Sequence, residues 1–111
     1  MVRRRIWKPR QVRRGLLRLG FTEDPGRGKG DHVWFYKQVE CLSGESHTIT
    51  TMVDMGVEDI PHRTMFYILD ALALDEETFY QAYRGQYTEA AYAEYLLTVP
   101  KQRLMPPAMR Q

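Results

Sequence analysis

Residues 29–54 read KGDHVWFYKQVECLSGESHTITTMVD, and this stretch decides the fold. Two runs rich in β-branched and aromatic residues, His32–Glu40 and Ser46–Asp54, are typical of β-strands. The five residues between them, Cys-Leu-Ser-Gly-Glu, favour a tight turn. The pattern predicts an antiparallel hairpin that turns around Ser43.

A turn at Ser43 sets the register of the predicted hairpin. It places Glu40 opposite Ser46 and His32 opposite Asp54. Because side chains alternate along a strand, one face then carries an apolar set: Val33, Phe35, Val39, Ile49 and Val53. The other face carries an aromatic and polar set: His32, Trp34, Tyr36, Gln38, Thr48, Thr50, Met52 and Asp54. We expect the apolar face to line the core and the aromatic and polar face to form a surface. A register slip of one residue would exchange these assignments.

The residues before the hairpin predict a helix and a short strand. Val12, Leu16 and Leu19 recur at helical spacing, so residues 9–19 are expected to form an amphipathic helix that stops at Gly20. Phe21 and the following threonine favour a short strand. Glycines and a proline then predict a mobile loop over residues 24–31.

The residues after the hairpin predict three more helices, over 63–73, 76–83 and 89–97, the last two capped by Asp75 and Thr88. Three prolines after residue 99 predict a disordered tail. The expected fold class is therefore α+β, with the order α-β-β-β-α and an added C-terminal helical segment. We expect a domain over residues 1–83 and an extension over 84–111.

Composition bounds the class of protein. At 111 residues with 43% hydrophobic and 27% charged residues, the chain is expected to form one globular domain. No apolar run approaches the roughly 20 residues that span a bilayer, and no secretory signal is recognisable, so no membrane association and a cytoplasmic location are expected. The single cysteine, Cys41, has no partner for an internal disulfide or a CxxC site.

Charge is distributed unevenly along the chain. Residues 1–30 contain ten Lys and Arg against two acids, whereas residues 31–99 contain three against twelve. A basic segment on an acidic body is typical of a protein that binds a polyanion, although a solvated helix face has the same composition. We expect RNA as the partner, with phosphates held by the arginines of the first helix: Arg10, Arg13, Arg14 and Arg18.

His32 is the candidate catalytic residue. RNA cleavage can use the 2′-hydroxyl of the substrate as nucleophile, so it needs a proton-transfer group and nearby cations but no obligatory metal or cofactor. Histidine exchanges protons near neutral pH, and Lys29, Gly30 and the loop amides are expected to face the phosphate. Asp54 is expected to orient the imidazole. The alternative for a histidine at a strand start is a surface or hydrogen-bonding residue.

Two other candidate sites follow from residue type. Trp34 and Tyr36 can stack on unpaired bases or pack against a helix or subunit, and both interpretations remain open. Three histidines and Cys41 lack the close spacing of metal ligands, so no metal site is predicted.

Several motifs, in order and spacing, resemble the HicA (YcfA-like) toxin family over residues 10–82. They are Gly-Phe at 20–21, Lys-Gly-Asp-His-Val-Trp at 29–34, Ile-Pro-His-Arg-Thr-Met-Phe-Tyr-Ile-Leu at 60–69 and Leu-Asp-Glu-Glu-Thr-Phe at 74–79. The resemblance implies a double-stranded-RNA-binding-like fold, mRNA cleavage by the histidine of a Gly-Ser-His motif, and neutralisation by a HicB-type antitoxin. Gly30 and His32 match that motif by position.

The chain departs from the family pattern at two positions. Asp31 stands where the family has serine, which adds a charge that repels phosphate, and Arg63 stands where the family usually has glycine. Two functions are therefore expected to compete: a metal-independent endoribonuclease, and a non-catalytic nucleic-acid or protein interaction module on the same fold. The aromatic side chains of the last helix are expected to dock it onto the domain or onto a second copy, which would give a homo-oligomer.

Overall fold

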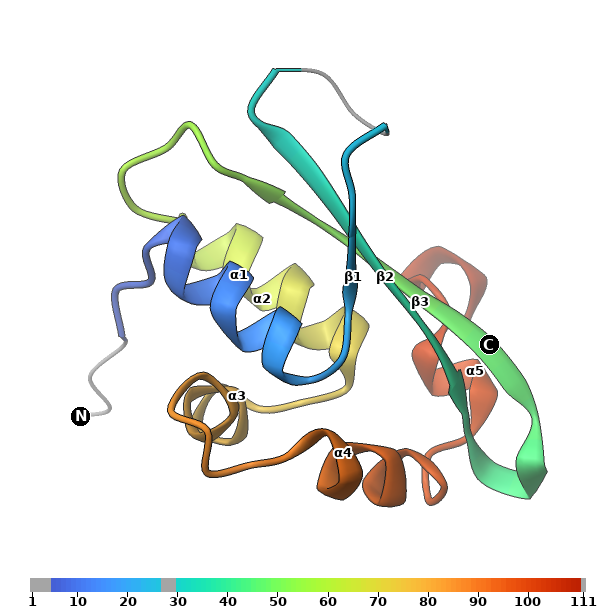
Figure 1. Ribbon diagram of the computed structural model, residues 1–111. Helices are drawn as coiled ribbons and strands as arrows, with labels where there is room; N and C mark the ends of the chain where they lie inside the picture. The colour runs from blue at the N-terminus through green and yellow to red at the C-terminus, as the bar shows by residue number, and fades with distance from the viewer. Residues whose placement is uncertain (1–4, 27–29, 111) are drawn as a thin grey trace.

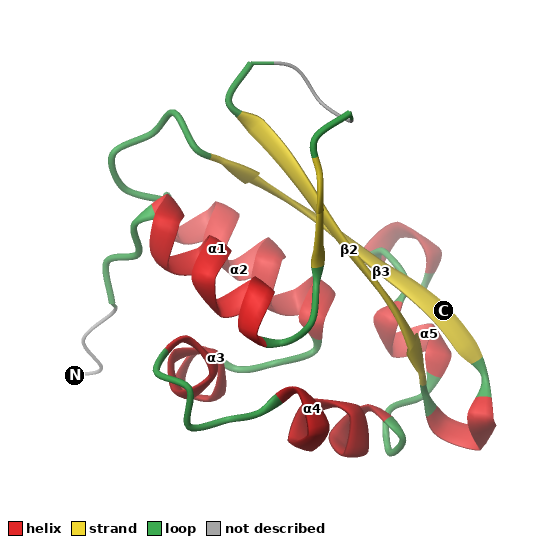
Figure 2. Ribbon diagram, in the orientation of Figure 1, coloured by secondary structure: helices red, strands yellow, loops and turns green. Residues whose placement is uncertain are grey.

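A computed structural model describes residues 5–26 and 30–110. Within these ranges the chain is an α+β protein, and the predicted class is confirmed (Figures 1 and 2). The elements are α1 (Pro9–Arg18), β1 (Thr22–Asp24), β2 (His32–Glu40), β3 (Ser46–Asp54), α2 (His62–Leu72), α3 (Glu76–Tyr83), α4 (Glu89–Leu96) and α5 (Lys101–Leu104), with 3-10 turns at Leu42–Gly44 and Pro107–Met109.

The three strands form one antiparallel sheet in the order β1-β2-β3. The predicted register is confirmed, since His32 lies opposite Asp54 and Glu40 lies opposite Ser46. The turn adopts left-handed conformations at Ser43 (φ 66°) and at the following glycine (φ 74°). These two residues reverse the chain in the space of the predicted turn, which is why the register could be inferred from the turn's position.

Hydrogen bonds at both ends of the hairpin fix the phase of the ladder. The Cys41 amide donates to the Glu45 carbonyl (2.8 Å), and the Met55 amide donates to the Asp31 carbonyl (2.8 Å). In an antiparallel pair every second residue bonds across the ladder, and the register runs without interruption between these ends. Odd-numbered residues therefore bond between β2 and β3, and the backbone groups of even-numbered residues point away from that pair.

Helices α1 and α2 pack on the apolar face of the sheet, which we call the core face. Their buried residues join Phe35 and Val53 in one hydrophobic core: Val12, Leu16, Met65, Ile68 and Leu72. Helix α3 approaches α1 at Gly15, where an added Cβ would lie 2.6 Å from the ring of Phe79. This glycine therefore sets how closely the two helices pack (Figure 1).

The predicted helix caps are confirmed, and one helix shifts by a residue. Asp75 accepts from the amide of Thr78 (2.7 Å), and Thr88 accepts from the amide of Ala91 (3.1 Å). The helix predicted over 63–73 instead spans His62–Leu72. It ends there because Ala73 is left-handed (φ 57°) and its amide caps the preceding turn.

The prediction of a disordered tail after residue 99 is wrong. Helix α5 forms directly after Pro100, and Leu104 is buried in the core. Arg110 then binds the Asp70 carboxylate of α2 (2.7 Å) and donates from Nε to the Met105 carbonyl (3.0 Å). The prolines indicate disorder, but the acid that orders the tail, Asp70, lies forty positions earlier in the chain. No local pattern marks that contact.

The last segments also complete the core. Tyr92 and Leu96 of α4 are fully buried, and the same cluster includes Val99 and Leu104. The Tyr92 hydroxyl donates to the Leu72 carbonyl at the end of α2 (2.8 Å). Burial raises the pKa of the Tyr92 phenol far above its ordinary value. The region after residue 83 is therefore joined to the rest by packing and by a buried hydrogen bond.

We expect Tyr92→Phe to lower the free energy of unfolding by about 1–2 kcal/mol, because the buried Leu72 carbonyl loses its donor. Urea unfolding followed by circular dichroism measures the change. Tyr95→Phe is the matched control: its hydroxyl donates to the Ala73 carbonyl (2.5 Å), but the side chain is exposed, so water replaces the bond. Equal losses in the two variants would contradict this role of Tyr92.

The raised pKa of Tyr92 also predicts a pH dependence. Above the unfolded-state pKa of about 10, the unfolded chain releases this proton while the folded chain retains it. The stabilisation of the folded state by the buried Tyr92 phenol is therefore complete below about pH 10, and it declines as the pH rises further. Wild-type stability relative to Tyr92→Phe should fall by about 1.4 kcal/mol per pH unit there. Urea unfolding of both proteins between pH 8 and 11.5 measures the difference, and a constant difference would oppose it.

Candidate functional site

The second face of the sheet, which we call the open face, contains no buried side chain. By the strand register it carries one set of residues from all three strands. They are Thr22 and Asp24 of β1; His32, Trp34, Tyr36, Gln38 and Glu40 of β2; and Ser46, Thr48, Thr50, Met52 and Asp54 of β3. The aromatic and polar surface that the alternation predicts is therefore present and accessible.

His32 and Asp54 lie together at one end of the open face. The distance from His32 Nε2 to Asp54 Oδ2 is 3.7 Å, and the side chains are 52% and 35% exposed. They form a non-hydrogen-bonded pair of the ladder, in which facing side chains approach most closely. The other carboxylate oxygen, Asp54 Oδ1, accepts from the Gly56 amide (2.9 Å). The turn after β3 thus holds the carboxylate while one oxygen faces the imidazole.

Trp34 and Tyr36 continue the same row along β2. Side chains two positions apart on a strand are separated by about 7 Å, so His32, Trp34 and Tyr36 form an evenly spaced line. Tyr36 is exposed and Trp34 is half-buried. Their cross-strand neighbours are Met52 and Thr50. Extended single-stranded nucleic acid can place successive bases on aromatic side chains arranged in this way.

The four arginines of α1 do not converge on His32. Helix α1 packs on the core face through its apolar side, so Arg10, Arg13, Arg14 and Arg18 are exposed on the helical layer, across the sheet from the open face (Figure 1). Arg13 pairs with Glu23 of β1 (2.7 Å), and the Arg18 guanidinium lies against Gly85. The sequence predicts one RNA-binding site for these arginines and His32, but the structure places the arginines on a different surface from His32.

The loop before His32 is described only in part. Lys29 and the two residues before it lie outside the described residues. Gly30 is left-handed (φ 62°), with no atom within 4 Å of an added Cβ. The Asp31 carboxylate packs against Gly56, where it would overlap an added Cβ. Asp31 is therefore directed to the turn after β3 and lies on the core-face side of the alternation, unlike His32.

The residues considered as metal ligands lie apart. His47 is half-buried beside Leu104, and burial lowers its pKa. His62 is exposed at the start of α2, and buried Cys41 donates from Sγ to the Glu45 carbonyl (3.1 Å). Within residues 5–26 and 30–110, no three His, Cys, Asp or Glu side chains are grouped so that they could hold a metal ion.

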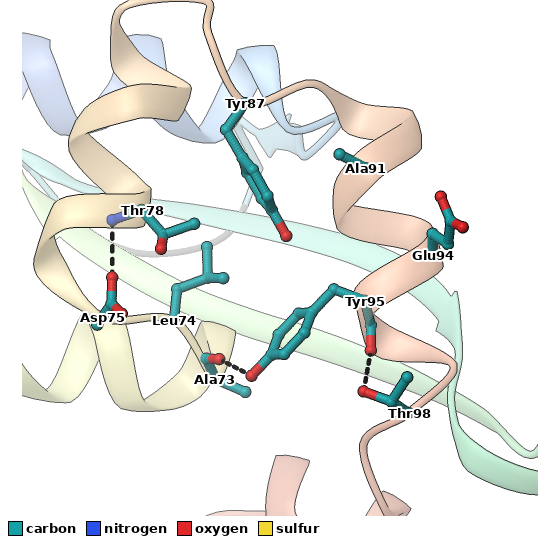
Figure 3. A pocket seen from close by; sticks show the side chains of 9 residues that line it. All are labelled: Ala73, Leu74, Asp75, Thr78, Tyr87, Ala91, Glu94, Tyr95 and Thr98. Carbon is teal, nitrogen blue, oxygen red and sulfur yellow. Dashed lines mark hydrogen bonds between the residues drawn. The ribbon is translucent and has the colours of Figure 1, made fainter.

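A separate cleft of about 530 Å³ lies between α3 and α4 (Figure 3). In this view the Tyr87 ring points into it from above and the Tyr95 ring from below, and Leu74 also lines it. Tyr95 uses its hydroxyl to bond the Ala73 carbonyl, and Asp75 caps α3. The Tyr95 hydroxyl and the Asp75 carboxylate thus stabilise the fold. The cleft forms where the end of α2 meets α3 and α4, which sequence spacing does not indicate.

Comparisons with known proteins add no relative. No family model matches the chain, and no curated protein or solved structure matches it. In the described part of the chain, none of the helices has both the length and the apolar character needed to cross a bilayer.

Proposed function

We propose that this chain is a HicA-like RNA-binding domain that cleaves mRNA as a metal-independent endoribonuclease, with His32 transferring the proton. The observation that carries the proposal is the pairing of His32 with Asp54 on an exposed sheet face, in line with Trp34 and Tyr36. A proton-transfer group, its orienting carboxylate and two base-stacking rings then lie on one accessible surface.

The chemistry needs only groups of the chain and of the substrate. The neutral imidazole of His32 accepts the proton of a ribose 2′-hydroxyl as its oxygen attacks the adjacent phosphorus. The P–O5′ bond breaks, and the leaving 5′-oxygen takes a proton from water, which yields a 2′,3′-cyclic phosphate and a free 5′-hydroxyl. The hydroxide left from that water takes the proton of the imidazolium, which returns His32 to its neutral form. Asp54 stabilises the imidazolium that forms, and its bond to the Gly56 amide keeps it in place.

The arrangement of elements supports the double-stranded-RNA-binding-like fold as part of this proposal. The order α1-β1-β2-β3-α2, with both helices on one face of the antiparallel sheet, is the order that the family resemblance implies. The motif residues lie at the starts of elements: Gly30 is in the turn before β2, His32 begins β2, residues 60–69 lead into α2, and residues 74–79 cap and begin α3.

Phosphate contacts complete the proposal. A strand of RNA that follows the open face would reach the arginines of α1 only by passing around an edge of the sheet, so Arg10, Arg13, Arg14 and Arg18 would bind flanking nucleotides. Lys29 and Gly30 would meet the phosphate next to His32. A HicB-type antitoxin that covers the open face and a cytoplasmic location belong to the same proposal.

One observation favours the non-catalytic interaction module as an alternative. Among its described residues the open face has no Lys or Arg, and it carries the acids Asp24, Glu40 and Asp54. Carboxylates repel phosphate and weaken binding to a polyanion. A protein partner would tolerate such a face better than RNA would, and the two functions differ in whether cleavage accompanies binding.

His32→Ala should reduce cleavage of a long unstructured RNA in EDTA by about 10²–10⁴-fold, the usual contribution of a general acid–base group. Gel electrophoresis of timed samples measures the rate. His62→Ala is the control, because His62 is also exposed but lies at the start of α2. It should cleave at the wild-type rate.

Three outcomes separate the functions. Cleavage lost only in His32→Ala supports the endoribonuclease. Salt-sensitive RNA binding without cleavage by the wild-type protein supports the module. Cleavage that is unchanged in His32→Ala refutes the role of this residue, whatever the true activity.

Asp54→Asn should lower the rate of RNA cleavage by only about two- to fivefold. The exposed pair with His32 is screened by solvent and contributes about 0.2–1 kcal/mol, and asparagine Oδ1 can still accept from the Gly56 amide. Cleavage rates measured from pH 5 to 8 would show the change. A loss as large as that of His32→Ala would indicate a direct chemical role for Asp54.

A further inference from the structure

Strand β3 has an unpaired outer edge. Because odd-numbered residues bond to β2, the amides and carbonyls of Thr48, Thr50, Met52 and Asp54 point outward. Within the described part of the chain, none of these backbone groups has a hydrogen-bond partner. The edge offers a row of alternating donors and acceptors, which another strand can satisfy.

The C-terminal half of β3 lacks the features that usually prevent an edge strand from pairing with another chain. From Thr50 to Val53 the strand has no proline, no charged residue and no bulge, which are features that protect sheet edges in other proteins. The C-terminal tail shares a cavity of about 300 Å³ with His47–Thr50, so it flanks only the lower part of the strand. The segment around Met52 is left uncovered by it.

Exposed aromatic rings on α2 flank the same edge. Tyr67 is 53% exposed and lines the cavity beside Thr48–Thr50, and Phe66 is 63% exposed. The two rings form an edge-to-face pair with centroids 5.9 Å apart. Neither ring belongs to the core, whereas an interface beside β3 would bury Tyr67.

We propose that a second copy of this chain binds here, with the two β3 strands paired antiparallel about a two-fold axis at Met52. In this register Met52 faces its own counterpart and Thr50 faces Asp54, so the outward backbone groups bond to each other and no like charges are opposed. A self-complementary patch of this kind is what a two-fold dimer requires.

The dimer would join two sheets into one, with both open faces on the same side. The α2 helices would then lie on the same side of the joined sheet. Tyr67, which lies beside Thr48–Thr50, would approach the end of the partner's β3, because Thr50 faces Asp54 of the other copy. The predicted homo-oligomer through the C-terminal helix uses a different surface, whose most exposed apolar residue is Leu97 at the end of α4 (47%). This proposal does not depend on RNA cleavage.

Sedimentation equilibrium of the full chain tests the proposal. We expect the wild-type protein to dimerise, and Met52→Asp to raise the dimer dissociation constant at least about thirtyfold, because two like charges would face each other at the axis. Leu97→Asp is the matched control and should dimerise like wild type. Circular dichroism verifies that each variant is folded. A monomeric wild type, or a dimer dissociated by Leu97→Asp but not by Met52→Asp, would overturn the proposal.

Amide hydrogen exchange distinguishes strand pairing from other modes of dimerisation. The Met52 and Thr50 amides should become protected as protein concentration rises into the dimer range. The Thr51 and Val53 amides bond to β2 in the monomer, so they should be protected at every concentration and serve as internal controls. A dimer whose Met52 amide exchanges as fast as in the monomer would refute pairing through β3.

Discussion

The register between β2 and β3 is the constraint on which the rest of the structure depends. It runs without interruption from the pair of His32 and Asp54 to the pair of Glu40 and Ser46. A shift of one residue would expose Phe35 and Val53 and bury the polar row of the open face. The same register brings the imidazole to the carboxylate and determines which backbone groups of β3 remain unpaired. Core, candidate site and sheet edge therefore follow from one alignment of two strands.

The length of the hairpin explains the helices after α2. Its turn extends beyond the region that α1 and α2 cover, and α4 and α5 pack along that part of β2 and β3 (Figure 2). Tyr92 and Leu104 belong to the same hydrophobic core as Val39 and Ile49 of the hairpin. The ion pair of Arg110 with Asp70 then holds the end of the chain against α2. The C-terminal segment thus completes the hydrophobic layer of the long hairpin.

The basic N-terminal segment is used partly within the molecule. Arg5 pairs with Glu77, Lys8 with Asp59 and Arg13 with Glu23. Each pair links a cation near the N-terminus to an acid elsewhere in the chain, so the charge available to a polyanion is smaller than the sequence count suggests. The exposed arginines that remain lie on the helical layer, and this separation shapes the path that RNA would follow around the sheet.

Local patterns in the sequence determined much of the fold. Side-chain alternation identified the two faces of the hairpin, turn residues identified its register, and Asp75 and Thr88 identified helix starts, because each depends on neighbours within a few positions. The pairing of His32 with Asp54 could be predicted for the same reason.

Contacts between distant segments were decided only by the tertiary structure. The order of the C-terminal tail depends on Asp70, the placement of the arginines depends on which side of α1 is buried, and the direction of Asp31 depends on Gly56. None of these partners is marked by spacing or composition. They become neighbours only when the helices pack on one face of the sheet, since that packing buries the most apolar surface.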